Sequence, residues 1–482
     1  MFRHVFSGLA TFLAVLSLTT VPAAETGRGK KPAAQQARNW TDATGQHRIR
    51  ATLLGVEDDK VRLRKSDGSE ITVPLERLSE LDQKWVAKQA TALESQAAAS
   101  EGGGEWPSFR GPNRDGKSPD TGLLKEWPEG GPKLLWKTDI LGEGFASVAV
   151  SGGQVYVTGN VGDQFTLFAF NLDGSLNWKV VVGPKANVSY PATRATPTVD
   201  GNRLYLLSSG GKVTCHDVKN GKVLWSRDKD EFGGSPGGWG YAESVLIYGN
   251  LAIFKPGGAK CVVALNKETG RDVWTSQGLN AGPEYSSCLV FDHDGMPILT
   301  TGTNQGIVFL NPKNGALLGK NGFSAGNTAN CPTPAYSDGH VFWANGYGKG
   351  GVCLKLGRAG ALTEAWTTHD MVCHHGGYVI HEGHIYGNHD DGWACLELAT
   401  GKKTYFEKAV GKGSVCWADG MLYLFSENHG QAALATCSPD GLQIKGKVKV
   451  DGDGPSWAHP VVIGGRLYLR YDKNLYCYDV KG

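Results

Sequence analysis

Six histidines fall within 21 residues, in the stretch HDMVCHHGGYVIHEGHIYGNH. Neutral imidazole is a common metal ligand, so this density is the first candidate for metal chemistry in the chain. The repeats described below weaken that interpretation, because His384 takes a hairpin position that Arg203 holds in another repeat. Only His374 and His375 fall in a loop that enters an innermost strand. We therefore expect no metal ion, and histidines that are solvated or packed in the core.

Three acidic turns resemble the opening of a calcium loop: DHDG at 292–295, NHDDG at 388–392 and DGDG at 451–454. An EF-hand needs a Glu at its twelfth position. Counted from the first and third turns, that position holds Thr303 and Val462, so hairpin turns explain these stretches better. The sequence contains no nucleophile-elbow, P-loop or dinucleotide-binding motif. A Ser-His-Asp or Cys-His triad stays open, because sequence order does not restrict it.

One set of polar and aromatic residues shares a position: each lies in a segment that leads into the innermost strand of a repeat. Such segments gather at one mouth of a central channel, and aromatic rings mixed with a few charges suit ligand binding. The predicted ligand-binding residues are Arg194, Tyr241, Glu243, Tyr285, Asn330, His374, His375, Trp457 and His459. Because a buried charge without a partner is costly, Arg194 and Glu243 should pair with each other or lie exposed. The alternative, in which these residues only fill the channel, stays open.

The elements that position these residues are repeats, which begin at Trp106. Each unit spans about 40 to 49 residues and holds four short strands, as in the blade of a β-propeller. Seven units are complete, and an eighth ends before its closing strand. The segment PKLLWKTDI, residues 132–140, supplies that strand and would remove open sheet edges. The sequence thus predicts an all-β, eight-bladed propeller over residues 106–482.

The stretch ALNKETGRDVW, residues 264–274, is one copy of a motif that recurs as CHDVKNGKVLW and AFNLDGSLNW. A cofactor site is used once, whereas a motif found in most repeats must serve each of them. Its Gly permits the positive φ of a hairpin turn, and its Trp is expected to pack between neighbouring blades. The predicted anchors are Trp136, Trp178, Trp225, Trp274 and Trp366, with Leu318 and Tyr405 in weaker copies.

Three zones precede the repeats. Residues 1–24 contain an apolar run that ends in VPAA and predict a signal peptide for export. Residues 38–90 contain short strands joined by turns and then a helix capped by Ser79, which together predict a small antiparallel barrel. Residues 91–105 lose all periodicity and are expected to be a linker. After the signal peptide, no segment approaches the ~20 apolar residues that a membrane span needs.

Two family resemblances extend these predictions. The phrases WTDATG, DGSEITVPLERLS and DQKWV resemble the SLA homology domain, an SH3-like module that recognises short peptides in a fungal adaptor. The opening EWPSFRGPNRDG and the repeats after it resemble the PQQ-repeat propeller superfamily. That superfamily implies either a dehydrogenase that binds pyrroloquinoline quinone (PQQ) and calcium, or a scaffold lipoprotein of outer-membrane assembly. The chain departs from both, because it has no adjacent cysteine pair, no CxxCH haem motif and no anchoring Cys after the apolar run.

These features favour an exported, non-enzymatic binding or scaffold protein of the periplasm, cell envelope or exterior. A quinoprotein-type dehydrogenase or another channel-mouth enzyme stays open as the alternative, although the residues do not support PQQ or calcium and no cofactor is expected. A net charge of +2 without a basic block argues against nucleic acid. We expect a protein or peptide partner, and for a small anionic or sugar-like ligand we expect Arg194 to bind its charge. The ten cysteines are expected to be buried thiols.

Overall fold

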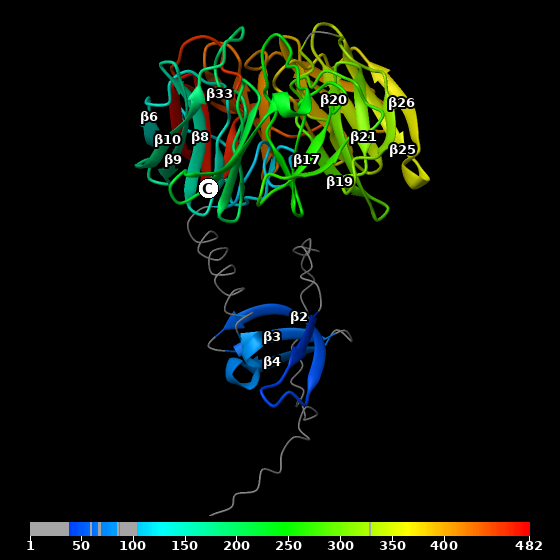
Figure 1. Cartoon of the computed structure of the whole chain (residues 1–482). Coiled ribbons are helices and arrows are strands. Elements are labelled where there is room, and N and C mark those ends of the chain that lie inside the picture. Colours follow the sequence, from blue (N-terminus) through cyan, green and yellow to red (C-terminus); the bar gives the residue numbers. More distant parts are fainter. Residues whose placement is uncertain (1–37, 58–59, 66–68, 84–85, 87–103, 327–328) are drawn as a thin grey trace, which may run out of the picture. The chain divides into compact units, whose positions relative to one another are not determined.

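The computed structural model of the protein describes residues 38–57, 60–65, 69–83, 86, 104–326 and 329–482 (Figure 1). The predicted signal peptide, residues 1–24, and most of the predicted linker, residues 91–105, lie outside the described residues. The chain divides into two compact units, Met1–Glu94 and Ser95–Gly482.

The N-terminal unit contains a four-stranded antiparallel sheet with the strand order β1-β2-β3-β4. Its elements are β1 (Arg38–Thr41), β2 (Arg48–Glu57), β3 (Lys60–Lys65), β4 (Glu70–Pro74) and the 3₁₀ helix η1 (Leu75–Arg77). Alternate residues of β3, Val61 and Leu63, are buried and pack with Trp40 in a small core. The Ser79 hydroxyl accepts a hydrogen bond from the backbone N–H of Asp82 at 3.2 Å, which is the geometry of a helix N-cap.

The strands of the second unit form eight sheets, which we number 1 to 8 in chain order (Figure 1). Sheet 1 comprises β7 (Ala149–Ser151), β8 (Gln154–Val161), β9 (Gln164–Asn171) and β10 (Leu176–Pro184), and sheet 2 comprises β11 (Thr198–Asp200), β12 (Arg203–Leu207), β13 (Lys212–Asp217) and β14 (Val223–Asp228). Sheet 3 comprises β15 (Leu246–Tyr248), β16 (Leu251–Phe254), β17 (Val263–Asn266) and β18 (Asp272–Thr275). Sheet 4 comprises β19 (Leu289–His293), β20 (Met296–Thr303), β21 (Gly306–Leu310) and β22 (Leu317–Asn321).

Sheets 5 to 8 continue the pattern. Sheet 5 comprises β23 (Ala335–Ser337), β24 (His340–Asn345), β25 (Gly350–Leu356) and β26 (Leu362–Thr368), and sheet 6 comprises β27 (Tyr378–His381), β28 (His384–His389), β29 (Gly392–Glu397) and β30 (Lys403–Glu407). Sheet 7 contains β31 (Gly413–Ala418), β32 (Met421–Ser426), β33 (Gln431–Thr436) and β34 (Ile444–Lys449). Sheet 8 comprises β35 (Val461–Ile463), β36 (Arg466–Tyr471) and β37 (Asn474–Asp479) together with β6 (Lys133–Thr138). Two 3₁₀ helices, η2 (Lys229–Phe232) and η3 (Arg358–Gly360), interrupt an otherwise nearly all-β unit.

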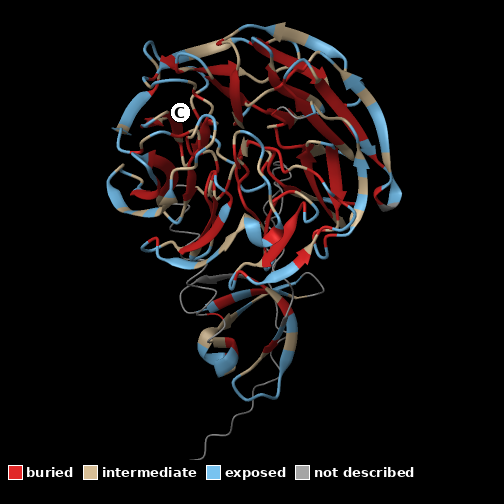
Figure 2. Ribbon diagram, turned by 45° about the horizontal axis from the view of Figure 1, so that its top comes forward, coloured by how far each residue is buried: buried red, intermediate tan, exposed pale blue. Residues whose placement is uncertain are grey.

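Burial differs between the strands of one sheet. In β9 every residue between the two ends is buried, whereas β10, at the edge of the same sheet, has exposed and half-buried residues only. A continuous apolar run is typical of a strand that is covered on both faces. Figure 2 shows this gradient, with the buried strands inside the unit and the exposed strands around its rim. The neighbouring sheets therefore cover each other's faces and form the core.

Sheet 8 is completed by a strand from the other end of the unit. Strand β37 pairs antiparallel with β6, and Cys477 lies opposite Trp136. This is the pairing that the sequence predicts for residues 132–140. It joins the two ends of the unit by backbone hydrogen bonds and leaves neither strand unpaired.

The Trp of the recurring motif contacts the next sheet. The indole N–H of Trp225 on β14 donates to the carbonyl oxygen of Lys267 in sheet 3 at 2.9 Å. In the same turn Gly270 has a φ of +70°, and a Cβ atom there would lie 2.8 Å from the Trp225 ring. A side chain at this position would therefore be strained and would collide with the ring. Equivalent hydrogen bonds join Trp136 to Leu172, Trp178 to Val218, Trp274 to Pro312 and Trp366 to Leu398.

The sequence also predicts an anchor at Leu318, and this prediction is wrong. Phe309 pairs with Gly319 and Leu310 pairs with Leu317, so Leu318 occupies a bulge between them. Gly319 takes the position that Trp holds in the other sheets, and a Cβ atom on it would lie 2.5 Å from the side chain of Leu362 in sheet 5. The same bulge lies directly before the anchor in other sheets, as between Asp272 and Trp274, so the anchor of sheet 4 falls on Gly319 and the prediction is displaced by one residue.

The segment before the first sheet runs along several others. Trp106 exchanges two backbone hydrogen bonds with Val150 of β7 in sheet 1. The short strand β5 (Lys117–Ser118) pairs parallel with β31 in sheet 7. The Asp120 carboxylate accepts a hydrogen bond from the backbone N–H of Gly465 in sheet 8 at 2.8 Å. We call this segment, residues 105–120, the inner strap.

Two arginines of the inner strap are buried and are satisfied by carbonyl oxygens. Arg114 donates to the carbonyl oxygens of Ser244 and Cys288, each at 3.0 Å, in the segments that lead into sheets 3 and 4. Arg110 donates to the carbonyl oxygen of Tyr378 in sheet 6 at 2.5 Å. Burial lowers the pKa of Arg114 to about 10. Each guanidinium thus ties the inner strands of other sheets to the strap through charge-assisted hydrogen bonds.

All ten cysteines are free, and eight of them are buried, which confirms the expectation of buried thiols for these eight. Cys331 and Cys437 are half-buried. Among the described residues, no helix has the length and apolar character needed to cross a membrane.

Candidate functional site

A cavity of about 260 Å³ lies where loops enter the innermost strands. Seven of the eight sheets and the inner strap contribute to its wall. We call it the inner pocket, and its wall consists of Phe109, Phe145, Ser147, Tyr190, Arg194, Trp239, Ala242, Tyr285, Ser287, Ala329, Cys331, Tyr347, His374, His375, Trp457 and His459.

The structure brings six of the nine predicted ligand-binding residues together at this pocket. They are Arg194, Tyr285, His374, His375, Trp457 and His459. Phe109, Cys331 and Tyr347 also line the pocket, and the sequence did not single them out. A signal was present for Cys331 alone, because it directly follows the predicted residue Asn330.

Two of the other three predicted residues are buried outside the pocket wall. Tyr241 is 1% exposed, and its hydroxyl donates to the carbonyl oxygen of Pro256 at 2.8 Å. Asn330 is fully buried, and its side-chain amide donates to the carbonyl oxygen of Gly326 at 3.0 Å. Both side chains therefore hold loops in place rather than face a ligand.

Glu243 is the third, and neither predicted outcome holds for it, because it does not pair with Arg194 and does not lie exposed. Its carboxylate accepts a hydrogen bond from the backbone N–H of Lys255 and is 2% exposed. Burial raises the pKa of Glu243 to about 7, against the opposing effect of Lys255. The Lys255 ammonium donates to the carbonyl oxygens of Ser286 at 2.5 Å and Gly302 at 3.0 Å. Glu243 thus belongs to the buried framework behind the pocket.

Aromatic rings form much of the pocket wall. The Trp457 indole stacks on the His375 ring with centroids 4.3 Å apart and planes inclined by 29°. The Phe145 and Tyr190 rings contact the same indole, with centroid distances of 4.6 Å and 5.5 Å. Tyr190 is 55% exposed, which places it at the rim. Flat rings at these distances offer stacking surfaces to a planar ligand.

Arg194 supplies the positive charge of the pocket. Its guanidinium donates to the carbonyl oxygens of Ala192 at 3.3 Å, Ser189 at 3.1 Å and Tyr190 at 2.6 Å. It also lies over the Phe145 ring, 5.8 Å from its centroid. Within the described part of the chain, no carboxylate forms an ion pair with it. Burial lowers the pKa of Arg194, and its charge is balanced by neutral oxygens only.

A hydrogen-bonded cluster lies beside the two neighbouring histidines. The Lys412 Nζ atom lies 3.0 Å from His374 Nδ1 and 3.0 Å from Glu427 Oε1. His375 Nδ1 lies 3.4 Å from Glu427 Oε2. Burial, with His375 and Lys412 nearby, lowers the pKa of His374 to about 3. Burial also lowers the pKa of His375, against the hydrogen bond to Glu427. Both imidazoles are therefore neutral near pH 7.

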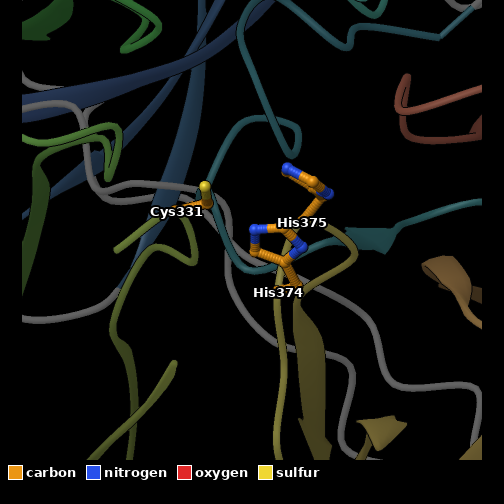
Figure 3. A group of neighbouring side chains, drawn as sticks. All are labelled: Cys331, His374 and His375. Carbon is orange, nitrogen blue, oxygen red and sulfur yellow. The ribbon is translucent and has the colours of Figure 1, made fainter. Parts of the chain in front are cut away.

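Cys331 faces these two histidines across the pocket wall. The Cys331 sulfur and one ring nitrogen each of His374 and His375 all lie within 4.8 Å of one another (Figure 3). Burial raises the pKa of the Cys331 thiol, so the free thiol is a weak nucleophile at neutral pH. The set of one sulfur and two imidazole nitrogens is one that could hold a transition-metal ion.

His459 contacts the backbone of the histidine pair. One of its ring nitrogens, Nε2, lies 3.1 Å from the His375 carbonyl oxygen. The other, Nδ1, is buried and has no hydrogen-bond partner among the described residues, and the same holds for His374 Nε2. Burial lowers the pKa of His459 to about 3. The pocket wall therefore contains polar atoms that the protein itself does not satisfy.

A family model described as outer membrane protein assembly factor BamB, a PQQ-repeat family, matches residues 120–237 and 239–405, which is more than half of the chain. The chain belongs to this family. A second model, described as SLA1 homology domain 1, matches residues 28–93. The protein is therefore a PQQ-repeat propeller of the BamB family with an N-terminal SLA homology domain.

Curated relatives of the BamB-family unit fall into two groups. The chain is 34% identical over 134 residues to the quinoprotein alcohol dehydrogenase PedH of Pseudomonas putida, a match that covers 26% of this chain and 22% of that protein. It is 29% identical over 139 residues to the outer membrane protein assembly factor BamB of Kangiella koreensis, which covers 28% of this chain and 32% of that protein. The chain thus spans about a fifth to a third of the length of these relatives.

Two solved structures share the fold. BamB from Moraxella catarrhalis superposes with a TM-score of 0.55 at 13% identity and covers 72% of this chain and 97% of that chain. Quinohemoprotein alcohol dehydrogenase from Comamonas testosteroni superposes with a TM-score of 0.58 at 12% identity and covers 81% of this chain and 84% of that chain. BamB and a dehydrogenase match about equally well, so the fold does not decide the function.

Proposed function

We propose that this BamB-family protein is an exported binding protein that acts as a scaffold and uses the inner pocket to bind a small ligand. We assign residues 1–24 to a signal peptide, 38–90 to an SH3-like domain, 91–105 to a linker and 106–482 to an eight-bladed propeller. The number of sheets and the β6–β37 pair support this layout. The relatives named as outer membrane assembly factors support a place in the periplasm or cell envelope.

The inner pocket carries the small-ligand part of this proposal. Its wall combines stacked aromatic rings with Arg194, a cation that has no carboxylate partner among the described residues. An anionic ligand with a planar or sugar-like ring fits this chemistry, because Arg194 would bind the charge and Trp457 would stack on the ring. A cavity of about 260 Å³ is close to the lower limit of ~300 Å³ for ligand pockets, so the ligand would be small.

The alternative is a dehydrogenase that uses PQQ and calcium, as the similarity to PedH suggests. Calcium takes six to eight oxygen ligands, usually including carboxylates. The wall of the inner pocket includes no Asp, Glu, Asn or Gln among its residues. The aromatic rings would accept a planar quinone, but the donor atoms do not fit the calcium ion. The pocket therefore favours binding over quinone chemistry, and we assign no cofactor.

The N-terminal unit would supply the second binding function. Its match to SLA homology domain 1 supports a role in recognising a protein or peptide. The relatives named as assembly factors support a protein partner for the propeller as well. A net charge of +2 gives no reason to expect nucleic acid.

The small-ligand assignment is tested by titrating the full chain with anionic ring compounds and following heat or tryptophan fluorescence. We expect Arg194→Ala and Trp457→Ala each to abolish binding, with little change in melting temperature, because both side chains are half-buried pocket residues. Arg271→Ala, which removes an exposed cation from a turn in sheet 3, is the matched control. Binding that survives in both pocket variants would refute the site.

The scaffold assignment has a separate test. The protein is loaded with PQQ and calcium, and alcohol oxidation is followed with an electron-accepting dye. We expect no turnover above that of free PQQ. Bound quinone absorbance together with alcohol oxidation would overturn the assignment and establish the dehydrogenase.

A further inference from the structure

The group of Cys331, His374 and His375 combines two loops that lie far apart in the sequence. Cys331 is in the segment before β23 in sheet 5, and the histidines are in the segment before β27 in sheet 6. Figure 3 shows the sulfur and a nitrogen of each ring facing one common space, and these atoms lie within 4.8 Å of one another. Zinc binds sulfur at about 2.3 Å and imidazole nitrogen at about 2.0–2.1 Å, so small side-chain rotations would bring all three atoms onto one ion.

Each of the two histidines has a ring nitrogen that could face an ion, and His375 also has a carboxylate partner. A metal-binding His usually donates its other ring N–H to a carboxylate, which fixes the tautomer. His375 Nδ1 lies 3.4 Å from Glu427 Oε2, and this leaves the Nε2 atom free to bind an ion. His374 Nε2 is buried and has no hydrogen-bond partner among the described residues. An unsatisfied buried nitrogen beside a thiol is costly unless something occupies the space between them.

We propose that Cys331, His374 and His375 bind one zinc or copper ion in the wall of the inner pocket. Thiolate and imidazole are ligands that select these two metals over magnesium, calcium and manganese. Three protein ligands leave a fourth position, and the cavity lies next to it. The site is therefore open, so water or an added anion completes the coordination. This proposal departs from the expectation from the sequence, where the repeat register outweighed the histidine run and no metal ion was expected.

Lys412 controls the occupancy of this site. In the metal-free protein its ammonium lies 3.0 Å from His374 Nδ1, so it donates to that atom and the imidazole proton resides on Nε2. Binding of an ion moves this proton to Nδ1, releases the Cys331 proton to solvent and turns the ammonium away from Nδ1. Lys412 keeps its second partner, Glu427 Oε1 at 3.0 Å. The lysine thus weakens metal binding in two ways. Its positive charge repels the ion, and its hydrogen bond to Nδ1 keeps the His374 proton on Nε2, the nitrogen that would bind the ion.

The test is a titration of the metal-stripped full chain with Co²⁺, an open-shell probe for zinc sites, followed by competition with Zn²⁺ and Cu⁺. We expect one ion per chain, a sulfur-to-cobalt charge-transfer band, and a rise in melting temperature with Zn²⁺. Cys331→Ser should remove the band and weaken binding by more than about 100-fold, since even second-shell partners contribute ~10–100-fold. Glu427→Gln should weaken it by about 10-fold or more.

Lys412→Gln gives the decisive result, because a merely structural lysine would not produce it. We expect this variant to bind Co²⁺ at least about tenfold more tightly, since a nearby positive charge is removed. Cys437→Ser, which alters the other half-buried cysteine, should leave the affinity unchanged. Binding that is unaffected by Cys331→Ser, or is weakened by Lys412→Gln, would overturn the proposal. These readouts concern the metal alone, so they are independent of the anion titrations.

Discussion

The inner strap and the inner pocket both place cations among the innermost strands, but these cations differ in burial and in the segments to which they donate hydrogen bonds. On the strap, Arg110 and Arg114 are buried and donate to carbonyl oxygens from other sheets. In the pocket, Arg194 is half-buried and donates to carbonyl oxygens of its own loop. The buried atoms His374 Nε2 and His459 Nδ1 have no partner among the described residues.

This difference separates a structural role from a binding role. The strap cations connect distant segments, so their hydrogen bonds hold the sheets together. The pocket cation connects residues of one loop, so its bonds orient the guanidinium without joining sheets. Unsatisfied polar atoms are rare in folded proteins and call for an explanation such as a bound ion. We therefore expect substitutions on the strap to change stability, and substitutions in the pocket to change binding.

The largest effect is expected from removing the strap together with β6. A variant lacking residues 1–141 loses the partner of β37, both buried arginines and the strand paired with β31. It should expose sheet edges and aggregate, whereas a variant lacking residues 1–105 should unfold cooperatively at nearly the same temperature as the full chain. Light scattering and thermal unfolding provide the measurement. Equal stability of the two variants would contradict the structural role of the strap.

A matched pair of substitutions tests the comparison residue by residue. Arg114→Met removes the guanidinium donor of the carbonyl oxygens of Ser244 and Cys288, and we expect it to lower the free energy of unfolding by about 2–6 kcal/mol, because each unsatisfied buried acceptor costs about 1–3 kcal/mol. Arg194→Met should lower it by less than about 1 kcal/mol, because that guanidinium is half-buried and bonds locally. Denaturant unfolding of both variants gives the values. Similar losses would show that the two cations serve the same purpose.

A smaller effect than that of Arg114→Met concerns Glu243, whose pKa burial raises from 4.5 to about 7. Between these values the folded protein holds a proton that the unfolded chain releases, so stability falls as the pH rises from about 4.5 through 7. Lys255 and Arg114 face this carboxylate and oppose the shift. Glu243→Gln should remove this slope and gain about 1–3 kcal/mol over the wild type at pH 8. Unfolding curves at pH 5 and pH 8 test this, and an unchanged slope would contradict it.

The sequence was sufficient to predict the repeats because each copy carries the same physical requirement. A turn Gly must leave room for the Trp of the preceding sheet, as Gly270 does for Trp225. Apolar strands and turn residues therefore recur at a regular spacing and can be read without coordinates. The exception is sheet 4, where the anchor position holds Gly319 in place of Trp, so residue type pointed to the neighbouring Leu318 instead.

The pocket was harder to predict, since it depends on how deep each side chain lies in its loop. Tyr241 and Arg194 both precede innermost strands, yet Tyr241 is buried under its loop and only Arg194 lines the pocket. Apart from its place next to Asn330, Cys331 gives no signal, because a free cysteine is typically a buried thiol. The proposed metal-binding role of Cys331 depends on His374 and His375, which belong to another sheet and lie near the sulfur only in the folded chain.

Strand β6 can pair only after β37 has been synthesised, because Trp136 near the start of the unit pairs with Cys477 near its end. Loop closure over such a separation is slow, and proteins dominated by distant strand pairs fold slowly. Strand β6, which is synthesised before any strand of sheets 1 to 7 except β5, therefore stays unpaired until almost the whole chain is available. A chain of this kind favours late, concerted folding over stepwise folding, and it remains open to chaperones for as long as its last strand is missing.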